Sequence, residues 1–132
     1  MNKKKLEVFL EFLVFGVIMG ITEDLIAVNF ATSETITFNV VLIVTLVAVP
    51  FAVIGELIVD RIYLFHKKRM EVFLEFLIFG VIMGIIEDLI AVNFATSEPI
   101  TWNVVLIVTL VTIPFAAFGE LIVDRVPLIP KK

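Results

Sequence analysis

The sequence predicts an all-α integral membrane protein whose four transmembrane helices form two consecutive hairpins in an up-down-up-down bundle. Three observations lead to this expectation: an apolar composition, four long apolar segments, and a second half that repeats the first. Hydrophobic residues make up 61% of the chain and charged residues 18%, whereas soluble domains are about half apolar and about a quarter charged. The composition therefore favours a membrane protein over a soluble domain.

The second half of the chain repeats the first. When residues 6–65 are aligned with residues 70–129, 48 of the 60 pairs are identical. A repeat this close is typical of a recent duplication or of a deliberate fusion of two copies. We therefore expect a first two-helix repeat over residues 1–65, a basic linker over residues 66–69 and a second repeat over residues 70–132. The ancestral two-helix unit would have worked as a homodimer.

Each repeat holds two apolar segments that are long enough to cross a bilayer. A transmembrane helix needs about 20 mainly apolar residues. The four expected spans each exceed that length and cover residues 6–30, 36–65, 70–94 and 100–128. The short polar sequences ATSET and ATSEP separate the two spans of each repeat, and their Thr, Ser and Pro residues are typical of turns.

The basic residues predict how the spans are oriented. They gather before the first span, between the second and third, and after the fourth, and neither of the two remaining turns has one. The positive-inside rule then places both termini and the linker in the cytoplasm, and makes this a multi-pass protein of the inner or plasma membrane. Both hairpins would point the same way. We expect the first span to stay attached, because it is longer than a signal peptide's apolar stretch and contains Glu11.

Acidic residues recur inside the predicted spans. The sequences GVIMGITEDLIAVNF and GVIMGIIEDLIAVNF place the pairs Glu23–Asp24 and Glu87–Asp88 roughly 8 Å to the outer side of the bilayer midplane. Four more glutamates lie roughly 9–11 Å to the inner side, namely Glu11, Glu56, Glu75 and Glu120. An ionised group in the bilayer core costs at least about 2.5–3.5 kcal/mol. These side chains must therefore face the protein interior, bind cations, hold protons or reach the headgroups.

Small residues predict which helix faces pack together. Gly16, Gly20 and Glu23 fall on one stripe of the first span, with Asp24 at its edge. The second span has its own stripe, made of Thr45, Ala48, Ala52, Gly55 and Glu56. We expect the two stripes to face each other around a pseudo-twofold axis.

Glycine and proline add two expectations about helix geometry. The GxxxG steps of the two repeats, Gly16–Gly20 and Gly80–Gly84, indicate close helix packing. A proline in the second span of each repeat indicates a kink that frees backbone carbonyls for a polar path; these are Pro50 and Pro114.

The residue types limit the chemistry. The chain has no cysteine, and its one histidine, His66, lies in the basic linker. Sites built from oxygen ligands alone favour hard cations such as Ca²⁺, Mg²⁺, Mn²⁺ or Na⁺. Acids that converge from two repeats cannot all be ionised, so such a cluster can exchange protons for a cation. The sequence contains no catalytic triad, phosphate-binding loop or dinucleotide fingerprint, and its few basic residues do not indicate a nucleic-acid partner.

The sequence therefore favours a small transporter or channel-like protein, not an enzyme, that moves protons or hard metal ions between its repeats. The predicted ligands are Glu23, Asp24, Glu87 and Asp88, with Glu56 and Glu120 as an inner relay and Glu11 and Glu75 as further candidates. No cofactor is expected apart from a bound hard cation. The expected partners are the lipid bilayer, the cation and the other repeat, and a larger homo-oligomer stays open.

Two alternatives remain. The first is an engineered or duplicated single-chain dimer that serves as a scaffold without transport, with the acids as contacts between helices. For Glu23 and Asp24 the rival to a binding role is a buried, neutral carboxyl group that is hydrogen-bonded to Thr45, Asn39 or a backbone carbonyl. The second alternative is an accessory subunit whose surface grooves bind a larger partner.

Overall fold

The chain folds into four α-helices, which confirms the predicted all-α class. The computed structural model describes residues 2–62 and 69–125, and the side chains of residues 2–58 and 74–121. The helices are α1 (Lys3–Ala31), α2 (Phe38–Ile62), α3 (Arg69–Ala95) and α4 (Trp102–Arg125). The predicted linker, apart from Arg69, lies outside the described residues, and so does His66.

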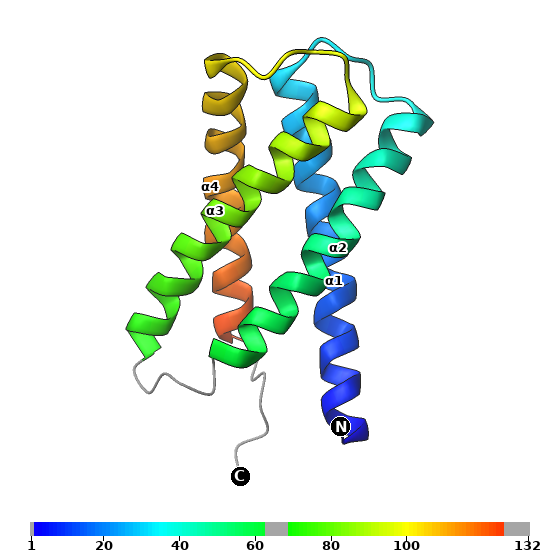
Figure 1. Cartoon of the computed structure of the whole chain (residues 1–132). Helices are drawn as coiled ribbons and strands as arrows, with labels where there is room; N and C mark the ends of the chain where they lie inside the picture. The colour runs from blue at the N-terminus through cyan, green and yellow to red at the C-terminus, as the bar shows by residue number, and fades with distance from the viewer. Residues whose placement is uncertain (1, 63–68, 126–132) are drawn as a thin grey trace.

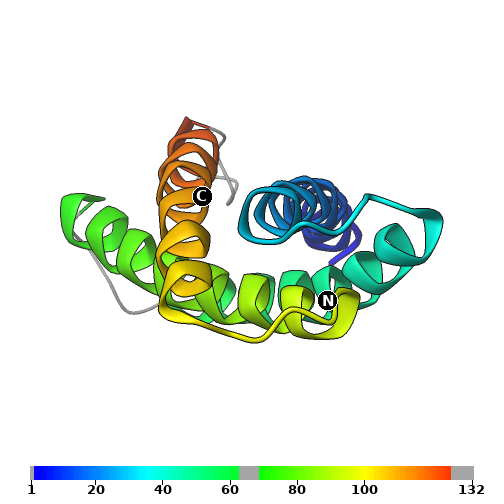
Figure 2. The ribbon, with the colours of Figure 1, turned by 90° about the horizontal axis from the view of Figure 1, so that it is seen from above.

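The helices form a bundle in which neighbours along the chain run in opposite directions. Both short turns lie at one end of the bundle, and the N-terminus lies at the other (Figure 1). Helices α1 and α3 contact each other and both remaining helices, whereas α2 and α4 make no contact with each other within the described residues. The view from above shows α2 and α4 on opposite flanks (Figure 2). The helices that carry the acid pairs are therefore the central ones.

Threonine side chains mark the starts of α2 and α4. The Thr37 hydroxyl accepts a hydrogen bond from the Val40 N–H at 3.4 Å, and Thr101 does the same for Val104 at 3.4 Å. These are N-cap interactions, which satisfy backbone donors that have no partner inside the helix. The caps explain why the helices begin at residues 38 and 102, slightly later than the apolar segments do.

The two turns touch each other across the bundle. Ser33 of the first turn donates a hydrogen bond to Glu98 of the second at 2.9 Å, and Ser97 of the second donates one to Glu34 of the first at 3.3 Å. The two contacts are reciprocal. They fix the hairpins side by side, with both turns at the same end.

The apolar core lies next to the turns. Its centre consists of four fully buried valines, Val28, Val44, Val92 and Val108, one from each helix. Ala27 and Ala91 are also fully buried and allow the central helices to approach closely. The bundle is therefore anchored at its turn end, and the acid pairs lie about one helical turn farther from the turns.

The outside of the bundle is also apolar. Exposed large apolar side chains occur on all four helices and include Leu10, Val14, Ile18, Leu46, Ile78, Ile82, Ile86, Leu106 and Leu110. Among the described residues, two helical segments are long and apolar enough to cross a membrane, Phe38–Ile58 of α2 and Trp102–Leu121 of α4, with mean hydropathies of 2.6 and 2.2. Only 11% and 17% of these segments are buried, so most of their apolar surface faces outward.

Candidate functional site: a buried carboxyl cluster

Four carboxyl groups meet where α1 and α3 contact each other. Glu23 and Asp24 come from α1, and Glu87 and Asp88 come from α3. Asp24 and Asp88 have no exposed surface, and Glu87 is 9% exposed. We call these four residues the carboxyl cluster. The structure thus brings together the two acid pairs that the sequence analysis singled out.

The pairs interlock across the helix–helix contact. The carboxyl group of Glu23 reaches Asp88 on the other helix, and that of Glu87 reaches Asp24. The Asp24 and Asp88 carboxyl groups also face each other within hydrogen-bonding range. Each acid therefore has a carboxyl group of the other repeat as its neighbour, so the four groups form one site.

Glycines make room for this crossed arrangement. A methyl group at Gly20 would lie 3.1 Å from Glu87 Oε1, and one at Gly84 would lie 3.2 Å from Glu23 Oε1. Both distances are shorter than ordinary van der Waals contact. Any larger residue at either glycine would push against the glutamate of the opposite repeat.

Among the described side chains, the Thr112 hydroxyl group donates a hydrogen bond to the cluster. Thr112 Oγ1 on α4 donates to Asp88 Oδ2 at 2.9 Å, and Thr112 is fully buried. The matching position in the first repeat is Ala48, which has no hydroxyl. Sequence reasoning missed Thr112 as a site residue, although its signal was visible as a polar substitution in a stripe of small residues.

Thr45 and Asn39, two of the partners predicted for neutral buried acids, have other surroundings, and a backbone carbonyl stays a prediction. Thr45 instead donates its hydroxyl hydrogen to the backbone oxygen of Val41 at 2.7 Å, and Asn39 is exposed near the start of α2. A threonine inside a helix commonly bonds to the carbonyl one turn earlier. Helical spacing alone does not reveal that the hydroxyl turns back to its own backbone.

Most oxygens of the cluster lack a hydrogen-bond donor within the described protein. These oxygens are Glu23 Oε1, both carboxyl oxygens of Asp24, Glu87 Oε1 and Asp88 Oδ1. An ionised carboxylate only accepts hydrogen bonds, whereas a protonated one also donates. A buried, unpaired charge costs several kcal/mol, and four of them would repel one another. The cluster therefore needs protons or a cation to be stable.

Protons suit the described arrangement more directly than a metal ion does. Across the described part of the chain, no group of three or more His, Cys, Asp or Glu side chains is placed to hold a metal ion. Carboxyl oxygens would have to move closer together to coordinate one. A proton shared between facing carboxyl groups needs only the contacts that already exist.

A cavity of about 230 Å³ adjoins the cluster. It follows α1 from Glu23 to Phe12 and α2 from Ala48 to Glu56, and it follows the matching parts of α3 and α4. Glu23 and Glu87 line one end, and Glu56 and Glu120 line the other. The predicted inner relay residues therefore share one cavity with the cluster. We call this space the central cavity.

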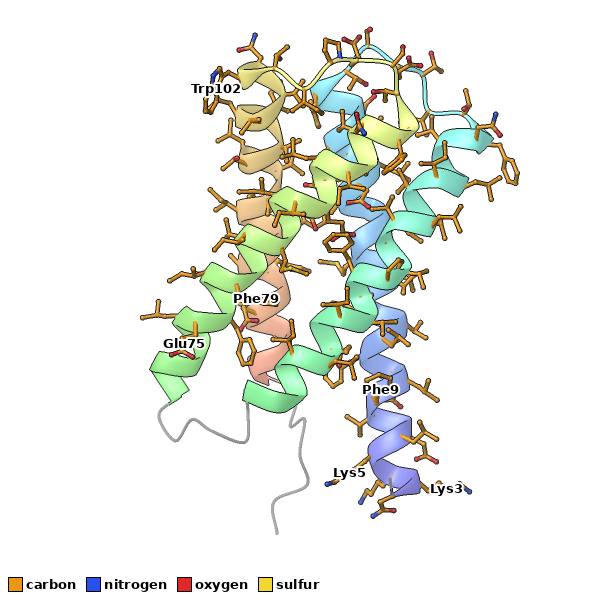
Figure 3. All side chains as sticks on the ribbon, viewed as in Figure 1. Lys3, Lys5, Phe9, Glu75, Phe79 and Trp102 are labelled. Atoms are coloured by element: carbon orange, nitrogen blue, oxygen red, sulfur yellow. The ribbon has the colours of Figure 1, made fainter. Side chains whose placement is uncertain are left out.

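Two predicted ligands do not belong to this site. Glu11 and Glu75 are exposed and do not line the central cavity. Glu75 lies on the part of α3 farthest from the turns (Figure 3). Their role as further cation ligands therefore stays a prediction.

Gly16 and Gly80 lie against alanine side chains, and the two helix prolines are exposed. A methyl group at Gly16 would lie 3.6 Å from the Ala52 side chain, and Gly80 has the same relation to Ala116. The GxxxG steps thus pack each hairpin's own two helices together. The prolines of α2 and α4 lie inside continuous helices and are exposed.

No protein-family model matches the chain, and no curated protein or solved structure matches it either. The functional argument therefore depends on the residues of the site itself.

Proposed function

We propose that the protein crosses a membrane with all four helices and moves protons, or a cation exchanged for protons, through the carboxyl cluster and the central cavity. One observation carries the proposal most directly. Three buried carboxyl groups and the half-buried Glu23 meet where α1 and α3 contact each other, Thr112 donates a hydrogen bond to one of them, and five of their oxygens have no hydrogen-bond donor in the described protein.

The distribution of polarity supports membrane insertion of all four helices. The acids of the carboxyl cluster lie inside the bundle, and many large apolar side chains lie outside. The outward stripes of α1 and α3 are apolar as well; on α3 the stripe consists of Leu74, Ile78, Ile82 and Ile86. Contiguous apolar surface of this extent is unusual for a soluble monomer, whereas lipid solvates it readily. The four acids of the carboxyl cluster avoid contact with lipid because they lie between α1 and α3.

The ends of the bundle support the orientation predicted from the sequence. Lys3 and Lys5 lie at the end opposite the turns, and Trp102 lies at the turn end (Figure 3). Trp102 is 81% exposed, which suits an aromatic side chain at a membrane–water interface. We therefore place the N-terminus in the cytoplasm and the two turns outside the inner or plasma membrane.

The central cavity supplies a path between the cytoplasmic half and the cluster. Glu56 and Glu120 line its cytoplasmic end, and Glu23 and Glu87 line its outer end. Protons can pass between carboxyl groups and water at both ends. In this scheme Asp24 and Asp88 share a proton, and their two glutamate neighbours exchange it with the cavity.

The decisive experiment removes charge from the cluster without changing its shape. The double variant Glu23→Gln with Glu87→Gln is reconstituted into liposomes, and proton movement is followed with an enclosed pH-sensitive dye. We expect flux to fall to the level of empty liposomes, because an amide cannot release a proton. The matched control is Glu11→Gln with Glu75→Gln, which changes two exposed acids of the same helices and should keep wild-type flux.

The same experiment distinguishes the remaining alternatives. Repeating it with Na⁺ or Ca²⁺ gradients shows whether a metal ion is the cation moved. If wild-type protein moves none of these ions and the Gln variant only lowers stability, the acids serve as contacts between helices. The scaffold interpretation would then replace transport.

A further inference from the structure

The central cavity is lined by apolar side chains that have no role in proton transfer. Six phenylalanines surround it, three from each repeat: Phe12, Phe15, Phe51, Phe76, Phe79 and Phe115. Met19 and Met83 complete the wall. Proton transfer requires water and polar groups, and phenyl rings supply neither. The composition of the wall therefore calls for a separate explanation.

Aromatic rings and carboxyl groups together form a recognised kind of environment for organic cations. The face of an aromatic ring attracts a cation, and quaternary ammonium ligands are bound in cages of such rings. Methionine adapts its shape to irregular ligands. Among the described residues that line the cavity, none is basic and four are glutamates. The electrostatic character of the wall thus fits a positive ligand that is also hydrophobic.

Size and access narrow the class of ligand. The volume of about 230 Å³ is below the roughly 300–1,000 Å³ of pockets for drug-sized molecules. Gly55 and Gly119 line the cavity beside Glu56 and Glu120, and a methyl group at either would meet nothing within 4 Å. No described residue therefore fills the space beside these glycines, so a small ligand can approach Glu56 and Glu120 there.

We propose that the central cavity binds one small hydrophobic organic cation, with a quaternary ammonium ion as the simplest example, in exchange for a proton of the carboxyl cluster. The ligand's positive charge lies between the phenyl rings next to Glu23 and Glu87. One of these glutamates releases a proton to solvent, so the charge of the site is unchanged. This inference rests on the proposed function for its carboxyl end and adds the class of substrate.

The test measures binding of tetraethylammonium to the purified full-length protein in detergent by isothermal titration calorimetry. We expect saturable binding at one site and, in buffers of different ionisation enthalpy, release of a proton on binding. The variant Phe15→Leu with Phe79→Leu keeps the wall apolar but removes two ring faces, and should weaken binding at least about tenfold. Phe51→Leu with Phe115→Leu is a second cavity pair for use if the first does not fold.

A matched control lies on the same two helices as the first pair. Phe30 and Phe94 are each 66% exposed and lie far from the cavity near the turns, so Phe30→Leu with Phe94→Leu should leave binding unchanged. Absence of binding to the wild type would overturn the proposal, and so would equal weakening by the cavity and control pairs. Proton flux without organic cation should survive in the Phe15→Leu, Phe79→Leu protein. Absence of tetraethylammonium binding to the wild-type protein, together with proton flux that depends on Glu23, would therefore overturn this inference alone and leave the proposed function standing.

Discussion

At the scale of single residues, one hydroxyl separates two otherwise matching acid pairs. Thr112 donates a hydrogen bond to Asp88, whereas Ala48 leaves both oxygens of Asp24 without a donor. The two halves of the cluster are therefore unequal. The hydrogen bond from Thr112 stabilises the Asp88 carboxyl group. The Asp24 carboxyl group has no such donor, so only a proton or the neighbouring acids can stabilise it.

This inequality predicts opposite effects for two matched substitutions. Thr112→Ala should lower the free energy of unfolding by about 1–3 kcal/mol, because it leaves a buried acceptor without its donor. Ala48→Thr should leave it unchanged or raise it by about 1 kcal/mol, because it offers Asp24 the hydroxyl donor that Thr112 offers Asp88. Unfolding in mixed detergent micelles measures both. A larger loss for Ala48→Thr than for Thr112→Ala would contradict the assigned hydrogen bond.

Replacing the two aspartates separates stability from function. In Asp24→Asn with Asp88→Asn each new amide supplies donors that the cluster lacks, and the two fully buried acids can no longer carry a charge. We expect the free energy of unfolding to stay equal or rise by about 1 kcal/mol, while proton flux in liposomes is lost. A loss of stability together with retained flux would show that the aspartates hold the helices together and take no part in transport.

At the scale of helices, glycines set how closely each hairpin packs. A methyl group at Gly84 would lie 2.5 Å from Thr112 Cγ2, whereas one at Gly80 would be 3.6 Å from Ala116. The two glycines are one helical turn apart on α3. They therefore form a natural pair for comparing a crowded position with a tolerant one.

We expect Gly84→Ala to destabilise the protein by about 1–3 kcal/mol through overpacking, and Gly80→Ala to be nearly neutral. Thr112 and Glu23 both border Gly84, so the first substitution should also disturb the cluster and reduce proton flux. Thermal unfolding in detergent, with flux assays on the same preparations, measures both effects. Equal stability of the two variants would show that α3 and α4 are farther apart at Gly84 than described.

The sequence was sufficient to locate the helices because each apolar segment is long and bounded by polar turns. The expected first span, residues 6–30, lies inside α1 (Lys3–Ala31), and the expected second span began two residues before α2 because hydropathy does not register the Thr37 cap. The carboxyl cluster was harder to predict from the sequence than the helices were. Helical spacing placed Asp24 at the edge of the predicted contact face, yet its side chain is fully buried. The reason is that α1 contacts three helices, whereas the prediction assumed one contact face with one partner helix. The central cavity depends on packing that helical spacing does not encode.

At the scale of the whole molecule, the carboxyl cluster lies between the two central helices, and large apolar side chains are exposed on all four helices. Reciprocal contacts between the turns, Ser33 with Glu98 and Ser97 with Glu34, hold the two hairpins in parallel. This arrangement brings the acid pairs of both repeats to the same depth. An antiparallel arrangement of the hairpins would separate them, so the cluster and the parallel topology depend on each other.

The topology can be tested with single cysteines, because the natural chain has none. Thr35→Cys and Pro99→Cys place a thiol in each exposed turn, and Asn2→Cys places one at the exposed N-terminal end. In intact cells, a membrane-impermeant maleimide should label both turn cysteines but not Asn2→Cys, which should react only after the membrane is opened. Labelling of all three cysteines in intact cells would contradict the cytoplasmic location of the N-terminus. Opposite behaviour of the two turns would mean antiparallel hairpins, and the carboxyl cluster could then not form within one chain.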